Sequence, residues 1–75
     1  MSEPTDRQLF REALGARLRA ARLAGGMSYG DMEAATGISR GDVRKYEVGR
    51  TEPGAWKLCL MAKALNTTMD GLAGL

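Results

Sequence analysis

Arginine and lysine are the residues of this chain whose type and spacing point most directly to chemistry. Between Arg7 and Arg50 there are nine basic and five acidic residues, a net charge of +4, whereas residues 1 to 6 carry −2 and residues 51 to 75 are neutral overall. Guanidinium and ammonium groups bind phosphates through charge-assisted hydrogen bonds. The basic middle of the chain and a pI near 9 therefore favour a polyanionic partner.

The groups that usually carry out catalysis or bind metals are nearly absent. The sequence has no histidine and one cysteine, Cys59. Histidine-based proton transfer, the usual zinc sites and an internal disulfide are thereby excluded. We expect no catalytic residues, no metal and no cofactor, and we predict that the protein is not an enzyme.

A length of 75 residues allows one small domain. No apolar run approaches the ~20 residues of a membrane span, and residues 1 to 12 hold five charged side chains and no apolar stretch, unlike a secretory signal. These features predict a cytoplasmic protein without a membrane partner. The predicted organisation is a flexible tail over residues 1 to 5 and one domain over residues 6 to 75.

Signals for helix starts and stops recur along this domain. In four places Ser or Thr stands three residues before a side chain that can bond back to the backbone: Thr5 to Gln8, Ser28 to Asp31, Ser39 to Asp42 and Thr67 to Asp70. A fifth start follows Pro53-Gly54, and the stops are Gly25-Gly26, Gly37, Gly49 and Asn66. The pattern predicts an all-α fold with five helices, at about residues 6–24, 29–36, 40–48, 55–65 and 68–74.

Apolar residues recur with the period of a helix in two of these segments. They are Phe10, Leu14, Leu18 and Ala21 in the first, and Leu58, Ala62 and Leu65 in the fourth. Cys59 and the methionines 27, 32, 61 and 69 lie among apolar neighbours, where such residues usually fill a core. Trp56 either covers this core or belongs to an interface.

The connection Gly37-Ile38-Ser39 has the length that joins the two helices of a helix-turn-helix. From Leu14 to Leu75 the sequence resembles the Cro/repressor-type (XRE-like) helix-turn-helix family of bacterial and phage regulators. The matching segments are Leu14-Gly15-Ala16-Arg17-Leu18-Arg19 with Arg22, Met27-Ser28, Gly37-Ile38-Ser39-Arg40, Val43, Tyr46-Glu47-Val48-Gly49-Arg50, Pro53, and Ala62-Lys63-Ala64-Leu65-Asn66 with Met69 and Leu72. The resemblance implies a five-helix DNA-binding domain with the helix-turn-helix over about residues 28–48.

Two residues depart from the family pattern. Tyr29 stands where the family usually has a glutamine that braces a phosphate and the recognition helix, a role that a tyrosine hydroxyl can also fill. Glu33 stands where the family usually has a small residue at the crossing of the second and third helices. An unpaired buried carboxylate is costly, so either Glu33 pairs with a nearby base or the two helices splay.

The resemblance also implies site residues. The third helix would lie in the major groove and present Arg40, Gly41, Arg44 and Lys45 to the bases. The alternative for the arginines is a solvated or phosphate-binding charge, and Asp42 is interpreted as a helix cap. Phosphate contacts are expected from Ser28, Tyr29 and Arg50. Arg17 and Arg19 are interpreted as a solvated face.

Arg22 and Glu47 match the family's structural ion pair between the first and third helices. Read as a catalytic group, Glu47 has no histidine, cysteine or second acid to assist it. We therefore predict that this pair is a scaffold salt bridge.

The resulting prediction is a transcriptional regulator of repressor or controller type that binds double-stranded DNA as a homodimer on a two-fold operator. The predicted dimer surface is Trp56, Met69, Leu72 and Leu75; in the competing view these side chains close the core of a monomer. The alternative function is a protein-interaction module, such as an antitoxin, that kept the fold and contacts a toxin, a sigma factor or RNA polymerase.

Overall fold

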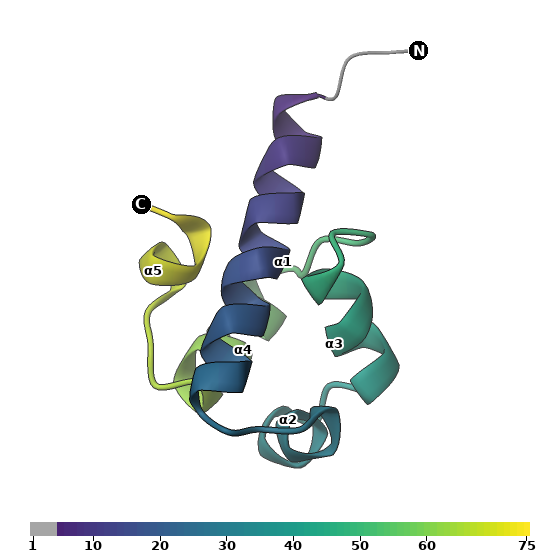
Figure 1. Ribbon diagram of the computed structural model, residues 1–75, viewed down its shortest axis with the longest axis vertical. Helices are drawn as coiled ribbons and strands as arrows, with labels where there is room; N and C mark the ends of the chain where they lie inside the picture. The colour runs from purple at the N-terminus through teal and green to yellow at the C-terminus, as the bar shows by residue number, and fades with distance from the viewer. Residues whose placement is uncertain (1–4) are drawn as a thin grey trace.

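The computed structural model describes residues 5 to 75, which form five α-helices and no strand (Figure 1). They are α1 (Asp6–Ala24), α2 (Tyr29–Thr36), α3 (Arg40–Glu47), α4 (Ala55–Ala64) and α5 (Met69–Ala73). Each bound lies within one residue of its prediction, and the all-α fold is confirmed. Within the described part of the chain, no helix is long and apolar enough to cross a membrane.

The helix caps explain these bounds. Thr5 and Gln8 form a full capping box on α1, so Thr5 belongs to the folded domain; the rest of the predicted tail, residues 1 to 4, lies outside the described residues. Ser28 and Asp31 form a second full box on α2, whereas the Ser39 hydroxyl only accepts a hydrogen bond at the start of α3.

The fourth predicted cap is wrong by one residue. Thr68, not Thr67, caps α5, and its side chain accepts a hydrogen bond from the Gly71 N–H. Thr67 lies after α4 and helps to cap its C-terminal end, because its N–H donates to the Ala62 carbonyl oxygen at 2.9 Å.

α1 packs against α3 and α5, whereas α2 packs against α3 and α4. In Figure 1, α1 runs along the long axis, with α5 on one side, α3 on the other and α2 near its C-terminal end. The buried apolar side chains form one cluster: Leu14, Leu18, Met32, Ile38, Val43, Tyr46, Met61, Ala62 and Leu72. Every helix contributes to this cluster, so the two short helices of the helix-turn-helix are held by tertiary packing rather than by their own length.

Cys59 lies farther from the core than predicted, and one of the two alternatives given for Trp56 is excluded. Cys59 is exposed, and Trp56 is 72% exposed, so Trp56 does not cover the core. Among the methionines, Met32 and Met61 are buried as expected, whereas Met27 and Met69 are only partly buried against the cluster. Within residues 5 to 75, no group of three acidic or cysteine side chains is arranged to hold a metal ion.

Gly15 allows α1 and α3 to approach at backbone distance. A Cβ atom at this position would collide with the carbonyl oxygen of Tyr46 and lie 2.5 Å from that of Glu47. Both oxygens belong to the last turn of α3, which cannot yield as a flexible side chain would. Glycine is therefore required here by a helix crossing and not by backbone conformation.

We expect Gly15→Ala to destabilise the fold by at least about 1–3 kcal/mol, because it overpacks this crossing. A glycine inside a helix normally costs about 0.5–1 kcal/mol of stability relative to alanine. Replacing glycine by alanine in a helix therefore usually stabilises a protein, and here we expect the opposite. The matched control is Gly41→Ala in α3, where an added Cβ meets nothing within 4 Å, and this variant should gain stability. Thermal unfolding followed by circular dichroism measures both effects, and a Gly15→Ala protein more stable than the wild type would contradict the packing argument.

Candidate nucleic-acid interface

The turn between α2 and α3 is fixed by its own residues. Gly37 ends α2 in the left-handed region with φ 74°, a conformation that glycine adopts at little cost. The next residue, Ile38, is buried in the core, and its N–H donates to the Thr36 hydroxyl at 3.1 Å. The turn therefore sets the angle at which α3 leaves α2.

One face of α3 is buried and the other is basic and exposed. Val43, Tyr46 and Glu47 face the interior. The four residues predicted to contact bases, Arg40, Gly41, Arg44 and Lys45, are all exposed. Because they are spaced by one and four positions, they share one side of the helix. The fold thus brings them together on a convex helical surface.

Asp42 lies beside this surface with its own partner. Its N–H donates to the Ser39 hydroxyl at 3.2 Å, and its carboxylate lies 3.8 Å from the Lys57 ammonium of α4. An acid in the first turn of a helix is favoured by the helix dipole. The capping hydrogen bond of α3 is made by the Ser39 hydroxyl, so the interpretation of Asp42 as a helix cap is wrong, and its carboxylate acts only through its charge near the start of α3.

A buried ion pair fastens the far end of α3 to α1. Arg22 donates from Nε to Glu47 Oε2 at 2.7 Å and from Nη2 to Glu47 Oε1 at 3.0 Å. Its third donor, Nη1, reaches the Met27 carbonyl oxygen at 2.9 Å. Both residues are 6% exposed. The hydrogen bond to Glu47 raises the pKa of Arg22 above its usual value, against the opposing effect of burial, so the guanidinium stays charged.

Tyr29 completes this network. Its hydroxyl donates to Glu47 Oε1 at 2.9 Å, and the Arg22 guanidinium lies 4.1 Å from the centre of its ring. The predicted donation from Tyr29 to a phosphate would first require this bond to break, because a phenol has one proton to donate. The role visible here is to brace the ion pair from α2.

Glu33 is paired, which answers the question raised by its position. Oε1 of its carboxylate accepts from Arg40 Nε at 3.2 Å and Nη2 at 3.0 Å, while Oε2 accepts from the Arg40 backbone N–H at 3.2 Å. The Glu33 side chain is 39% exposed, so the helices close without burying a free charge. The hydrogen bonds from Arg40 lower the pKa of Glu33 below its usual value of 4.5.

The predicted phosphate contacts lie on two segments. Ser28 is exposed at the start of α2, where it shares a capping box with Asp31, and its hydrogen bonds lower the pKa of that carboxyl. Arg50 is exposed in the segment after α3, and its N–H donates to the Lys45 carbonyl oxygen at 2.9 Å.

Sequence reasoning missed the residues that hold the Arg50 segment in place. Arg11 Nε donates to the Gly49 carbonyl oxygen at 2.7 Å, and Arg7 pairs with Glu52 at 2.9 Å. The bond from Arg7 lowers the pKa of Glu52. These contacts span 38 and 45 positions, so neither short-range spacing nor a local motif signals them.

The predicted dimer surface needs one correction. Leu72 is 2% exposed and belongs to the core cluster, because α5 packs this side chain against α1. By contrast, Trp56 and Leu75 are largely exposed, and Met69 is partly buried. Leu75 follows Gly74, which ends α5 in the left-handed region, so it does not continue the buried face.

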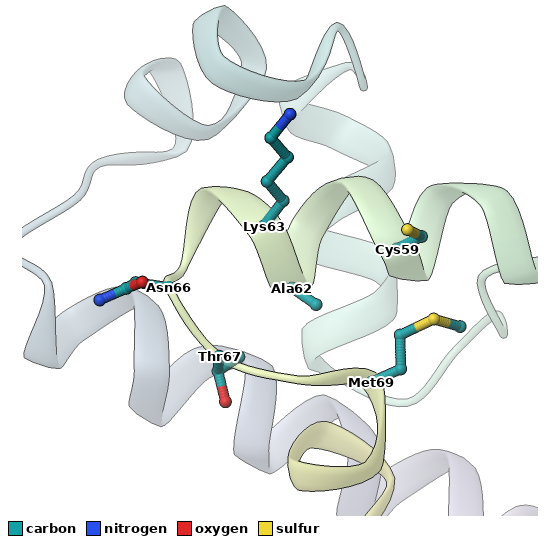
Figure 2. A pocket seen from close by; sticks show the side chains of 6 residues that line it. All are labelled: Cys59, Ala62, Lys63, Asn66, Thr67 and Met69. Atoms are coloured by element: carbon teal, nitrogen blue, oxygen red, sulfur yellow. The ribbon is translucent and has the colours of Figure 1, made fainter.

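An open pocket of about 390 Å³ lies between α4 and the start of α5. It is lined by Cys59, Ala62, Lys63, Asn66, Thr67 and Met69. In Figure 2 the Met69 side chain points from the start of α5 toward Cys59 of α4. The pocket is therefore partly apolar and includes one lysine, Lys63. One of its walls is α4, the helix that also carries Trp56.

Removing Glu47 should unfold most of the protein. Glu47→Ala leaves the buried Arg22 guanidinium without its counter-charge, which typically costs ~3–5 kcal/mol, and a domain of this size has only about 5 kcal/mol in total. Helical circular dichroism during thermal melting measures the loss. The control is Glu52→Ala, which breaks the exposed pair with Arg7 and should hardly change the melting temperature. A Glu47→Ala protein that melts with the wild type would show that the pair is dispensable.

Comparison with known proteins agrees with this geometry. The family model described as a helix-turn-helix domain matches residues 13–75. The restriction-modification controller protein C.AhdI from Aeromonas hydrophila is 28% identical, with a TM-score of 0.78 over 81% of this chain and 92% of that chain. The clp gene regulator ClgR from C. glutamicum is 31% identical, with a TM-score of 0.79 over 93% of this chain and 86% of that chain. No curated protein sequence matches the chain.

The family match covers the whole helix-turn-helix, α4, α5 and α1 from residue 13 onward. Proteins of this type are DNA-binding regulators and in general are not enzymes. The chain belongs to the helix-turn-helix domain family and is a DNA-binding transcriptional regulator of the Cro/repressor (XRE-like) type.

Proposed function

We propose that the protein binds a two-fold symmetric operator as a homodimer, with α3 of each subunit in the major groove. The observation that carries this proposal is the outer side of α3, where Arg40, Gly41, Arg44 and Lys45 are exposed together while the opposite side is locked to α1 through Glu47. A recognition helix needs a surface that can contact the bases and a fixed orientation relative to the duplex.

Arg44 is an exposed candidate for base reading. The described structure gives its side chain no salt bridge, and its guanidinium lies 5.9 Å from the centre of the Tyr29 ring. An arginine with a free fork can donate two hydrogen bonds to guanine O6 and N7. Lys45 lies beside it, and Gly41 offers no side chain to hold α3 away from the bases.

Phosphate contacts on each side of α3 would set its register. The first turn of α2 offers unpaired backbone N–H groups next to Ser28. On the other side, Arg50 projects from a segment that Arg11 and Arg7 tie to α1. The start of α2 and the Arg50 segment are both fixed relative to α3. A phosphate bound at either one would therefore limit how deeply α3 enters the major groove.

The dimer is supported by an argument about specificity and by the exposed apolar residues. One recognition helix reads only a few base pairs, so discrimination against a genome calls for two half-sites, about 34 Å apart. Three apolar residues remain available for a two-fold contact: Trp56 on α4, Met69 at the start of α5, and Leu75 after α5. Trp56 and Cys59 are three positions apart on α4, which places both on the side of the pocket described above.

The resemblance to C.AhdI supports a repressor or controller type of regulator. A regulator of this type would act in the cytoplasm, where the bacterial chromosome is accessible. The alternative of a protein-interaction module gains no support from Tyr29 and Glu33, because both departures are absorbed by hydrogen bonds inside the helix-turn-helix.

Salt-dependent binding to duplex DNA tests the proposed function. With about eight phosphate contacts per dimer, the logarithm of the association constant should fall with the logarithm of the salt concentration at a slope of about −7. Arg44→Ala should lose about 1–3 kcal/mol of discrimination at one base pair per half-site, whereas Arg50→Ala should weaken all duplexes alike and flatten the slope. The proposal fails if neither genomic nor random duplexes are bound at low salt.

Light scattering tests the dimer. At micromolar concentration the mass should be close to twice 8.1 kDa, and Trp56→Glu should halve it without changing the circular dichroism spectrum, because it places a charge in the apolar contact. Leu23→Glu is the matched control, since Leu23 is an exposed leucine on α1 and should leave the mass unchanged. A monomer at every accessible concentration, with one protein bound per duplex, would overturn the dimer.

A further inference from the structure

The pairing of Glu33 with Arg40 joins a residue of α2 to the first residue of α3. Three hydrogen bonds connect them, two from the Arg40 side chain to Oε1 and one from its backbone N–H to Oε2. The Arg40 side chain nevertheless remains 66% exposed. The guanidinium is therefore held on one edge while the rest of it faces outward.

The edge that Glu33 occupies leaves the other donors free. A guanidinium has five N–H donors in a rigid planar fork, and Glu33 takes those of Nε and one of Nη2. Nη1 and the second hydrogen of Nη2 remain, which form the end of the fork. This end has the spacing needed for two bonds to guanine O6 and N7.

Gly30 lies against the same guanidinium. A Cβ atom at Gly30 would be 3.6 Å from Arg40 Nη2 and 3.7 Å from Nη1, so the group rests on the first turn of α2. The plane of the fork is thus limited by α2 on one side and by the Glu33 carboxylate along one edge. An unpaired arginine at the start of α3 would have no such restriction.

We propose that Glu33 is a positioning residue that orients Arg40 for reading a guanine and so determines specificity at that base pair. This inference rests on the proposed function, because it requires α3 to enter the major groove. Two effects follow from the pairing. The rotational freedom of Arg40 is already reduced before DNA binds, and the adjacent carboxylate opposes the capture of Arg40 by a phosphate.

Glu33 therefore favours matched DNA over unmatched DNA. A neutral residue at position 33 would free Arg40 to bind any phosphate within reach, which raises affinity for all sequences and removes a preference for one of them. The carboxylate also accepts the first N–H of α3, a purely structural contribution of the kind a helix cap makes. The experiment must separate these two roles.

The test measures dissociation constants of the full chain for a duplex selected from random sequences and for its single-base variants. Arg40→Ala should lose about tenfold or more of the preference at one base pair of each half-site. Glu33→Ala should lose about three- to tenfold at the same base pair, keep the preference set by Arg44, and add about one unit to the salt slope for each freed arginine. In an Arg40→Ala background, Glu33→Ala should cause no further loss of preference.

Two variants act as controls. Glu33→Gln keeps an oxygen that can accept from Arg40 Nε and Nη2, so it should retain most of the preference that Glu33→Ala loses. Asp70→Ala removes an exposed carboxylate of α5 that has no salt bridge in the described part of the chain, so it should leave the preference at every base pair unchanged. Thermal melting of each variant reports the capping contribution independently of DNA.

Four results would overturn the proposal. A Glu33→Ala protein that loses affinity equally for all duplexes, with a lower melting temperature, would show that Glu33 is only a cap. An equal loss of preference with or without Arg40 would show that the two residues do not act together. If the wild type binds no duplex, both the proposed function and this inference fail. If the wild type binds selectively and Glu33→Ala has the same base preference, this inference alone fails.

Discussion

The orientation of the recognition helix depends on one interaction, the buried ion pair of Arg22 and Glu47. Two charges withdrawn from water are tolerated only where their hydrogen bonds are satisfied, and here the guanidinium reaches Glu47 and the Met27 carbonyl oxygen while Tyr29 serves the carboxylate. The backbone contact at Gly15 lies about two turns from Arg22 along α1, and on α3 it involves the carbonyl oxygens of Tyr46 and of Glu47 itself. Together they fix α3 at its C-terminal end, and Glu33 fixes it at its first residue through α2.

Among the basic residues of the chain, two groups have opposite tasks. One group is Arg7, Arg11 and Arg22, which donate hydrogen bonds to other groups of the protein. Arg44, Lys45 and Arg50 stay exposed. The net charge of the middle segment counts both groups equally, although the first is already bound to groups of the protein. Composition therefore indicates the class of partner but not which cations meet it.

Local signals predicted the fold well because each helix end is decided by a few neighbouring residues, as at Thr5 with Gln8 and at Gly37. The Arg22 and Glu47 pair was accessible only through the resemblance to a family. Leu72 was misplaced because a helix of five residues is too short for periodicity to reveal which side is buried. The partners of Tyr29, Glu33 and Glu52 depend on how helices cross, which side-chain types and spacing along the chain do not specify.

The ties between α1 and the segment after α3 have a dynamic consequence. Arg11 holds the Gly49 carbonyl oxygen, Arg7 holds Glu52, and a Cβ at Gly49 would stand 3.0 Å from the Glu12 backbone. The first turns of a helix fray readily unless something outside them adds contacts. Fraying of α1 at this end would release the segment that carries Arg50, so amide hydrogens in these two regions, 38 positions apart, should exchange with solvent as one cooperative unit.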